Sequence, residues 1–139
     1  MKENSIILTL PIPPSLNKLF STITKDRYGR PLDRPKRVKS QDYKNWLQLA
    51  DIEYKKIWID YTITWDEWLE AHLNYFLPLY YKNGKKKKQD LDNFLKPTFD
   101  FLWDNLKGFK DEYIRKITTE KIDSNTNLVK IILREIWEK

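Results

Sequence analysis

Residues 69–81 read L-E-A-H-L-N-Y-F-L-P-L-Y-Y, and this stretch decides the fold. Every second residue from Leu69 to Leu79 is apolar, and polar side chains stand between them at 70, 72 and 74. Alternation with a period of two predicts a β-strand with one buried face. We expect the strand to end near Tyr81, because Asn83-Gly84 breaks the pattern. Residues 60–68, just before it, fit either a helix end or a turn.

On the C-terminal side of this strand the sequence predicts a helix and two more strands. Apolar residues recur at helical spacing at Phe94, Leu95, Phe99, Leu102, Trp103 and Leu106. Gly108 is the expected C′ stop, and Pro97 must lie in the first turn or kink the helix. Tyr113–Ile122 and Leu128–Trp137 are the two strands. Residues 123–127, D-S-N-T-N, are typical of a hairpin loop between them.

On the N-terminal side, Ser5–Leu10 is predicted to be a buried strand that ends at Pro11. Residues 11–17, P-I-P-P-S-L-N, form an extended, stiff turn. Residues 24–39 are polar and basic and contain Gly29, Pro31 and Pro35, so we expect a mobile loop. A helix over Ser40–Ile59 follows, with Ser40 as its N-cap. Its periodic positions are Tyr43, Trp46, Leu47, Ala50, Tyr54 and Ile57.

These elements predict an α+β fold in one domain, residues 1–139, with a mixed sheet packed against two helices in the order β-α-β-α-β-β. At 139 residues the chain has the length of a single domain. No run approaches the roughly 18 apolar residues of a membrane span, so no membrane partner is expected. The first ten residues lack a small-residue cleavage site. There is no Cys and one His, which excludes disulfides, thiolate metal sites and paired imidazoles, and fits a reducing cytoplasm.

Positive charge is concentrated in two blocks. The net charge is +6, and the Lys and Arg excess lies in Lys25–Lys39 and Lys82–Lys88, whereas residues 41–80 are acidic. Nucleic acid is the natural partner of such blocks, because each neutralised phosphate releases counterions. Two solvated surface loops without a partner are the alternative.

The chemistry is concentrated between Lys85 and Asp111. Asp90 and Asp92 are one residue apart, so in an extended segment they face the same side. Their oxygens are hard ligands, suited to Mg²⁺ or Mn²⁺. Four preceding lysines would bring a phosphate to the same place, and Asn93 and Lys96 follow at the start of the helix. Asp111 lies beyond that helix and joins the pair only if the intervening chain folds back.

Three carboxylates, a lysine and a basic run are the parts of a metal-dependent phosphodiesterase. Lys96 would stabilise the charge that develops on the phosphate. Each residue also has an ordinary structural interpretation: Asp92 as an N-cap, Asp111 as a turn residue, and Lys96 as a first-turn lysine. Spacing alone leaves both interpretations open.

The stretch K-K-K-K-Q-D-L-D-N-F-L-K-P-T-F-D-F-L, residues 85–102, resembles the signature of the RusA-type Holliday junction resolvases. The similarity continues through residues 108–114, and it includes the N-terminal strand with Pro13–Asn17 and the helix start at Val38–Trp46. Two departures stand out. Lys110 replaces the first of two adjacent Asp that family members often have, which leaves Asp111 or Glu112 to complete the site. The longer, Trp-rich segment 58–68 is a second departure, about which the resemblance says nothing.

The resemblance implies a Mg²⁺ site, with Mn²⁺ a substitute, made of Asp90, Asp92 and Asp111, and it implies a catalytic Lys96. It also implies a small homodimer, typical of phage and prophage genomes, that uses no small-molecule cofactor. Such a dimer nicks opposing strands of a four-way DNA junction symmetrically. The residues expected to contact DNA are Asn17, Arg34, Lys36, Arg37, Lys39, Lys85, Lys86, Lys87 and Lys88.

We therefore predict a Mg²⁺-dependent, structure-selective endodeoxyribonuclease that resolves Holliday junctions in DNA recombination and repair, in the cytoplasm of a bacterial host. Phosphate contacts carry little sequence information, so selectivity would come from junction shape. Two alternatives belong to other classes. One is a non-catalytic protein of the same fold that binds junctions or single strands. The other is a structural or regulatory phage protein whose acidic residues 41–80 bind another protein.

Overall fold

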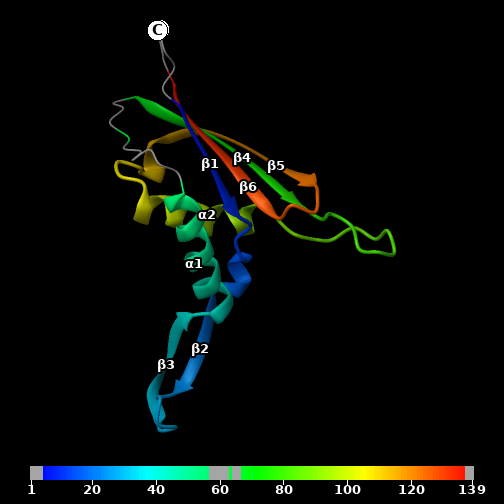
Figure 1. Ribbon diagram of the computed structural model, residues 1–139. Helices are drawn as coiled ribbons and strands as arrows, with labels where there is room; N and C mark the ends of the chain where they lie inside the picture. The colour runs from blue at the N-terminus through cyan, green and yellow to red at the C-terminus, as the bar shows by residue number, and fades with distance from the viewer. Residues whose placement is uncertain (1–4, 57–62, 64–66, 137–139) are drawn as a thin grey trace.

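The computed structural model describes residues 5–56, 63 and 67–136 of the chain (Figure 1). Its elements, in chain order, are β1 (Ser5–Pro11), the short 3-10 helix η1 (Leu16–Lys18), β2 (Phe20–Lys25), β3 (Pro31–Lys39), α1 (Gln41–Lys55), β4 (Trp68–Leu77), α2 (Asp92–Asn105), the 3-10 helix η2 (Asp111–Tyr113), β5 (Ile114–Asp123) and β6 (Leu128–Ile136). The predicted α+β class is confirmed, with a β2–β3 hairpin added to the predicted order. No helix within these residues is long and apolar enough to cross a membrane.

The main sheet has four strands in the order β1-β6-β4-β5. β4 pairs with β6 antiparallel and with β5 parallel. A parallel pair needs a crossover connection, and α2 supplies it between β4 and β5. The alternating sequence that predicted β4 is confirmed, because Leu69, Ala71, Leu73, Tyr75 and Leu77 are all buried.

The predicted hairpin between β5 and β6 is wrong. β4 lies between these two strands, so they do not pair with each other. Their connection passes over the end of β4, where the Ser124 amide donates a hydrogen bond to the Leu77 carbonyl at 3.1 Å. A turn-forming sequence between two strands does not reveal whether a third strand separates them, and β4, with an alternating buried face, takes the central place.

Both helices cover one face of this sheet and close the core (Figure 1). Trp46 of α1 meets Phe101 of α2 with ring centroids 5.6 Å apart, and its Nε1–H donates to the Pro11 carbonyl at 2.9 Å. In the core, the Thr98 hydroxyl donates to the Phe94 carbonyl at 2.7 Å. That hydroxyl therefore accepts the hydrogen bond from the Tyr75 hydroxyl, 3.0 Å away.

Helix ends agree with the sequence in part. Ser40 caps α1 as predicted, since its hydroxyl accepts a hydrogen bond from the Tyr43 amide at 3.1 Å. The expected end at Ile59 and the segment 60–68 fall largely outside the described residues. Pro97 lies in the second turn of α2 and is buried, not in the first turn. Gly108 stands two residues beyond the C-cap Leu106, further out than the expected C′ position, with φ +82°.

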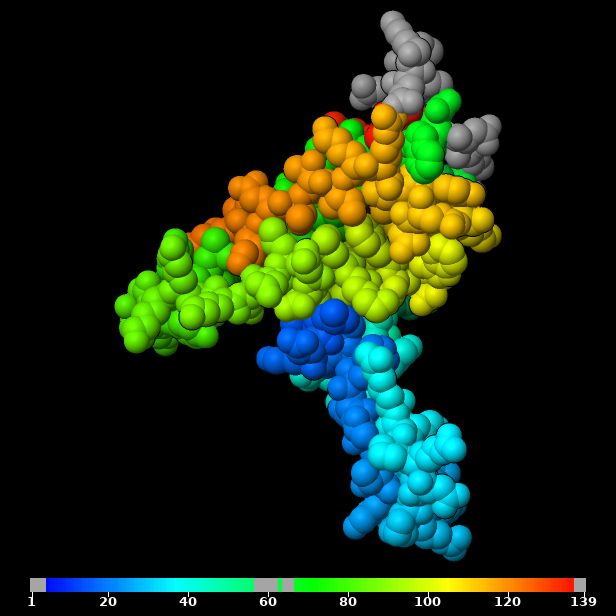
Figure 2. Space-filling model, turned by 180° about the vertical axis from the view of Figure 1, so that it is seen from behind, coloured from blue at the N-terminus to red at the C-terminus, as the bar shows by residue number. Residues whose placement is uncertain are grey.

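The predicted mobile loop at 24–39 is also wrong, because most of it belongs to the β2–β3 hairpin, residues 20–39, which we call the basic hairpin. It projects away from the body of the molecule (Figures 1 and 2). Its tip is fixed by a five-residue turn: the Asp26 amide donates to the Arg30 carbonyl at 2.8 Å, and the Gly29 amide to the Asp26 carbonyl at 3.1 Å. Both strands are edges, where proline is tolerated, so Pro31 and Pro35 do not prevent pairing.

β4 ends at Leu77, before Pro78, and not near Tyr81. Residues 79–88 form a second projection, which we call the basic arm (Figure 1). Tyr80 and Lys86 pair across it. Its turn repeats that of the basic hairpin: the Tyr81 amide donates to the Lys85 carbonyl at 2.8 Å and the Gly84 amide to the Tyr81 carbonyl at 2.9 Å. Gly29 and Gly84 occupy equivalent places with φ +79° and +84°, as is usual in three-residue hairpin loops.

Candidate active site

A polar cavity of about 290 Å³ lies where the basic hairpin and the basic arm meet the body. Two parts of the chain that are far apart in the sequence build it: η1 with the residues before it, and the continuous stretch from the base of the basic arm to the start of α2. In Figure 2 the blue segment around η1 lies against the start of α2, between the two projections. The lining residues are Ser15, Asn17, Lys18, Tyr81, Lys87, Lys88, Gln89, Asp90, Asn93 and Phe94.

Hydrogen bonds hold the backbone on both sides of this cavity. On one side, the Ser40 hydroxyl donates to the Lys18 carbonyl at 2.6 Å, and the Ser40 amide donates to the Leu19 carbonyl at 2.8 Å. On the other, the Lys121 ammonium donates to the Gln89 carbonyl at 2.6 Å. The N-cap of α1 thus also positions η1, and β5 positions the residue that precedes Asp90.

Asp90 shares this cavity with three lysines. Lys18, Lys87 and Lys88 line it together with the amide side chains of Asn17 and Asn93. Carboxylate and amide oxygens are the donors that Mg²⁺ and Mn²⁺ prefer, and the ammonium groups attract phosphate. The donor chemistry therefore fits a hard cation beside a phosphate. Among the described residues that line the cavity, however, Asp90 is the sole carboxylate.

Asp92 and Lys96 lie on the exposed side of α2. Asp92 is the first residue of the helix and Leu91 its N-cap, so the alternative that Asp92 caps the helix is wrong. Lys96 follows one turn later, with its ammonium 3.3 Å from the Asp100 carboxylate and 57% of its side chain exposed. Neither residue lines the polar cavity, although Asp92 is two residues from Asp90.

Asp111 lies at the far end of the sheet from the polar cavity. Ile114, just after η2, pairs with Leu69 at the start of β4, whereas the cavity follows the other end of β4. Helix α2 connects the cavity end of the sheet to the end where Asp111 lies. Its 14 residues give it a length of roughly 21 Å, at 1.5 Å per residue. Glu112 lies in the same 3-10 turn as Asp111. Residues 5–56, 63 and 67–136 contain no group of three or more His, Asp or Glu able to hold a metal, so the expected three-aspartate cluster does not form within one chain.

The other residues expected to contact DNA separate into three places. Asn17, Lys87 and Lys88 line the polar cavity, while Lys85 and Lys86 lie further out on the basic arm. On the basic hairpin, Lys36 pairs with Ile23 and Arg37 with Thr22, so Lys36 and Arg37 point to opposite faces. Lys39 shares the face of Arg37, whereas Arg34 lies between Lys36 and Pro31, where the register of the two strands shifts.

Aromatic rings hold part of this charge in place. The Arg37 guanidinium lies 3.8 Å from the centroid of the Phe20 ring, and the Lys39 ammonium 5.7 Å from that of Tyr43. At the base of the basic arm, the Lys87 ammonium lies 5.4 Å from the Tyr81 ring. Cation–π contacts of this kind leave the cation accessible on its outer side, so these groups remain able to face a phosphate.

Sequence reasoning did not assign Lys18, Tyr81 or Gln89 to the site. Lys18 follows the expected Asn17, and its approach to Asp90 depends on the way η1 meets α2, which no local pattern encodes. Arg27 and Arg30 at the tip of the basic hairpin were also not assigned. The sequence did contain a signal for the tip of the basic hairpin. The same kind of basic turn occurs twice, as R-Y-G-R at 27–30 and as K-N-G-K at 82–85.

Comparison with known proteins adds one match. A family model described as endodeoxyribonuclease RusA matches residues 11–134 of the 139-residue chain. The match includes η1, both projections, α2 and Asp111. No curated protein sequence matches significantly.

Proposed function

The chain belongs to the RusA endodeoxyribonuclease family, and we propose that it resolves four-way DNA junctions by metal-dependent hydrolysis of opposed strands. The observation that carries the proposal is the position of Asp90, in a polar cavity between two basic projections. Phage or prophage DNA recombination and repair, in the cytoplasm of a bacterial host, is the proposed setting.

The two projections supply the grip on DNA. The basic hairpin carries seven Lys and Arg against two Asp, and the basic arm carries five Lys and no acidic residue. A two-stranded hairpin by itself is marginally stable, and most residues of β2 and β3 are exposed. Its charge and its exposure on both faces suit contact with the phosphates of two duplex arms. Selectivity for a branched substrate follows from the angle between the projections.

The metal would be held by Asp90 and Asp92 with a third carboxylate. Since Asp111 of the same chain lies at the other end of the sheet, we assign this place to Asp111 of a second subunit in a homodimer. These three carboxylates would hold a divalent ion, and the chemistry it would supply there is polarisation of the scissile phosphate and a lowered pKa of a water molecule. Two such sites related by a two-fold axis would face the opposed strands of a junction, which has approximate two-fold symmetry.

We assign to Lys96 the role of stabilising the negative charge that develops on the phosphate during cleavage. Its partner in the isolated chain is Asp100, at 3.3 Å. Exposed ion pairs one helical turn apart contribute little free energy, so Lys96 can leave Asp100 for a phosphate at small cost. Lys18, Lys87 and Lys88 hold the flanking phosphates at the cavity.

The decisive experiment compares a labelled four-way junction with a linear duplex of the same sequence, each with Mg²⁺ and with chelator. We expect paired symmetric nicks in the junction alone, only with metal, and at least a hundredfold slower cutting by Asp90→Asn with junction binding retained. Asp104→Asn, an exposed carboxylate near the other end of α2, is the matched control and should cut normally. Equal cutting of the linear duplex would indicate a general nuclease. Binding without cleavage in any metal would favour the non-catalytic junction-binding alternative.

A further inference from the structure

The basic arm presents an exposed tyrosine ring at the polar cavity. Tyr80 and Lys86 pair across the arm, and successive residues of a strand point to opposite sides. Tyr81 and Lys87 therefore share the other face, and both line the polar cavity, whereas Tyr80 does not. Tyr81 is 56% exposed, and among the described residues it belongs neither to the hydrophobic core nor to the side chains packed against the core. An open aromatic ring thus stands beside the phosphate site.

Backbone hydrogen bonds and a cation hold this ring in place. The Tyr81 amide donates to the Lys85 carbonyl at 2.8 Å, and the Lys87 amide donates to the Leu79 carbonyl at 2.8 Å. The Lys87 ammonium lies 5.4 Å from the centroid of the Tyr81 ring. A side chain that is already held in one orientation loses little conformational freedom when a ligand binds, which favours affinity.

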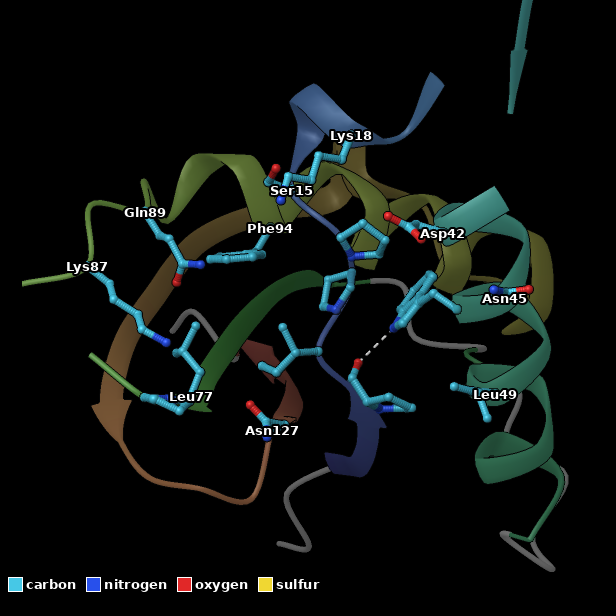
Figure 3. Close-up of a pocket in the computed structure, with 16 residues that line it drawn as sticks. Ser15, Lys18, Asp42, Asn45, Leu49, Leu77, Lys87, Gln89, Phe94 and Asn127 are labelled. Atoms are coloured by element: carbon cyan, nitrogen blue, oxygen red, sulfur yellow. Dashed lines mark hydrogen bonds between the residues drawn. The ribbon is translucent and has the colours of Figure 1, made fainter. Parts of the chain in front are cut away.

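A larger cavity of about 510 Å³ adjoins the polar cavity, and Lys87 stands at the rim that the two share (Figure 3). The aromatic rings of its lining are closed to a ligand, because Trp46 is only 4% exposed and Phe94 only 3%. The Trp46 Nε1–H is also held by the Pro11 carbonyl, the dashed line in Figure 3. Of the described residues that line either cavity, Tyr81 is therefore the one that offers an open aromatic ring.

A base can stack on Tyr81 only where its neighbouring base has moved away. In a continuous duplex both faces of every internal base are already covered, so contact with a protein ring first requires the costly opening of a base step. At the branch point of a four-way junction the stack is interrupted, and that cost is small. One sugar joins a base to its phosphate, so a base on Tyr81 belongs to a nucleotide at or next to the phosphate held by Lys87 and Lys88.

We propose that Tyr81 stacks on the base beside the phosphate in the polar cavity, and that this contact selects DNA whose base stack is interrupted. The proposal rests on the proposed function and adds a local source of selectivity to the angle between the two projections. Stacking is indifferent to which base is present, because every base has a π-face. Tyr81 is then a specificity-determining residue that acts through its ring and does not need its hydroxyl.

Binding to a four-way junction and to a linear duplex, both in chelator, tests the stacking contact. We expect Tyr81→Ala to bind the junction about tenfold more weakly than wild type and the duplex within about twofold of it. Tyr81→Phe, which keeps the ring and removes the hydroxyl, should match wild type on both. Tyr80→Ala is the matched control, adjacent on the same arm and similarly exposed (49%) but outside the cavity lining, and it should also match wild type.

Junctions that carry one abasic nucleotide at a time near the branch point identify the base that lies on Tyr81. Wild type and Tyr80→Ala should lose affinity about tenfold at one position, whereas Tyr81→Ala should show no further loss there, because it already lacks the other half of the contact. The same loss in Tyr81→Ala as in wild type would overturn the stacking contact.

A wild-type protein that binds every abasic junction as well as the intact one, and still prefers the junction to the duplex, would also overturn the stacking contact while leaving the proposed function standing. Equal binding of junction and duplex by the wild-type protein would refute both.

Discussion

Gly108 shows how one residue ties α2 to a neighbouring segment. Its φ of +82° is unfavourable for side chains, and a Cβ there would lie 1.9 Å from the Ile63 carbonyl oxygen. The Ile63 amide also donates to the Lys107 carbonyl at 2.7 Å, so the two backbones cannot separate without losing that bond. Glycine is required here for its conformation and its lack of volume.

We expect Gly108→Ala to lower the free energy of unfolding by about 2–4 kcal/mol, because the substitution combines backbone strain with a clash against backbone. Urea unfolding at neutral pH measures this. Gly84→Ala is the control: it has a similar positive φ but nothing within 4 Å of the added Cβ, so it should cost only the backbone strain, about 1–2 kcal/mol. Equal costs for the two variants would contradict the close approach to Ile63.

Tyr75 gives the stability of the protein a dependence on alkaline pH. Burial raises the pKa of the Tyr75 hydroxyl above its ordinary value, which is about 10. Unfolded protein therefore loses this proton at lower pH than folded protein does. Stability is retained below pH 10 or so and falls as the pH rises further.

Tyr75→Phe should unfold about 1 kcal/mol more easily at pH 7, because the hydrogen bond to Thr98 is lost, and should show a shallower loss of stability between pH 9 and 11. Some slope should remain, because burial and the nearby Asp100 and Asp104 also raise the pKa of Tyr43. Urea titrations across this range measure the slopes. Tyr28→Phe, at a side chain 74% exposed, should match wild type, and an unchanged slope in Tyr75→Phe would refute this account.

At the scale of elements, β4, α2 and the cap of α1 follow from the sequence because each has an apolar period or a capping residue that acts locally. The basic hairpin does not, since its strands bury almost nothing and therefore show no apolar period. The β5–β6 connection has the residues of a hairpin loop, yet strand order depends on which strand is buried most deeply. The sequence likewise proposes Asp90 and Asp111 as site residues, but their separation depends on the strand order, which no local pattern encodes.

Arg34 and Lys36 of the basic hairpin are the better candidates for independent phosphate contacts, because Arg37 and Lys39 also lie over rings of the protein. We expect Arg34→Glu/Lys36→Glu to weaken junction binding roughly tenfold or more at low salt and to reduce the dependence of log K on log salt by about two. Mobility-shift titrations at several salt concentrations measure both. The double variant Lys107→Glu/Lys130→Glu, away from both projections, is the control. A salt slope unchanged from wild type in Arg34→Glu/Lys36→Glu would exclude these two residues as phosphate contacts.

At the scale of the whole molecule, the separation of Asp111 from Asp90 determines how damaged subunits should complement each other. If the third carboxylate comes from the second subunit, a dimer of one Asp90→Asn chain and one Asp111→Asn chain contains one intact site and one doubly damaged site. If both residues act within one chain, neither site is intact. We therefore expect the mixed proteins to recover junction nicking, on one strand at a time, although each variant alone is inactive.

This arrangement can be tested by refolding the two variants together at equal concentration. The measurement is the rate of single nicks and of paired nicks in a four-way junction. About half of the dimers should be mixed, so the nicking rate should return to roughly a quarter of wild type by counting intact sites. Mixing Asp90→Asn with Asp92→Asn is the control, and it should stay inactive because both residues belong to the same half of the site. Recovery in the control, or none in the test mixture, would refute the shared site.

The basic hairpin joins the body near Phe20 and Lys39, and its strands are otherwise largely exposed. Its reach can therefore vary without repacking the core. Removing two residues from each strand shortens it by about 7 Å and keeps every side chain on its original face. Under the proposed function the hairpin sets how far along a junction arm the protein reaches, and we expect nuclease protection of that arm to retreat toward the branch point in proportion to the length removed.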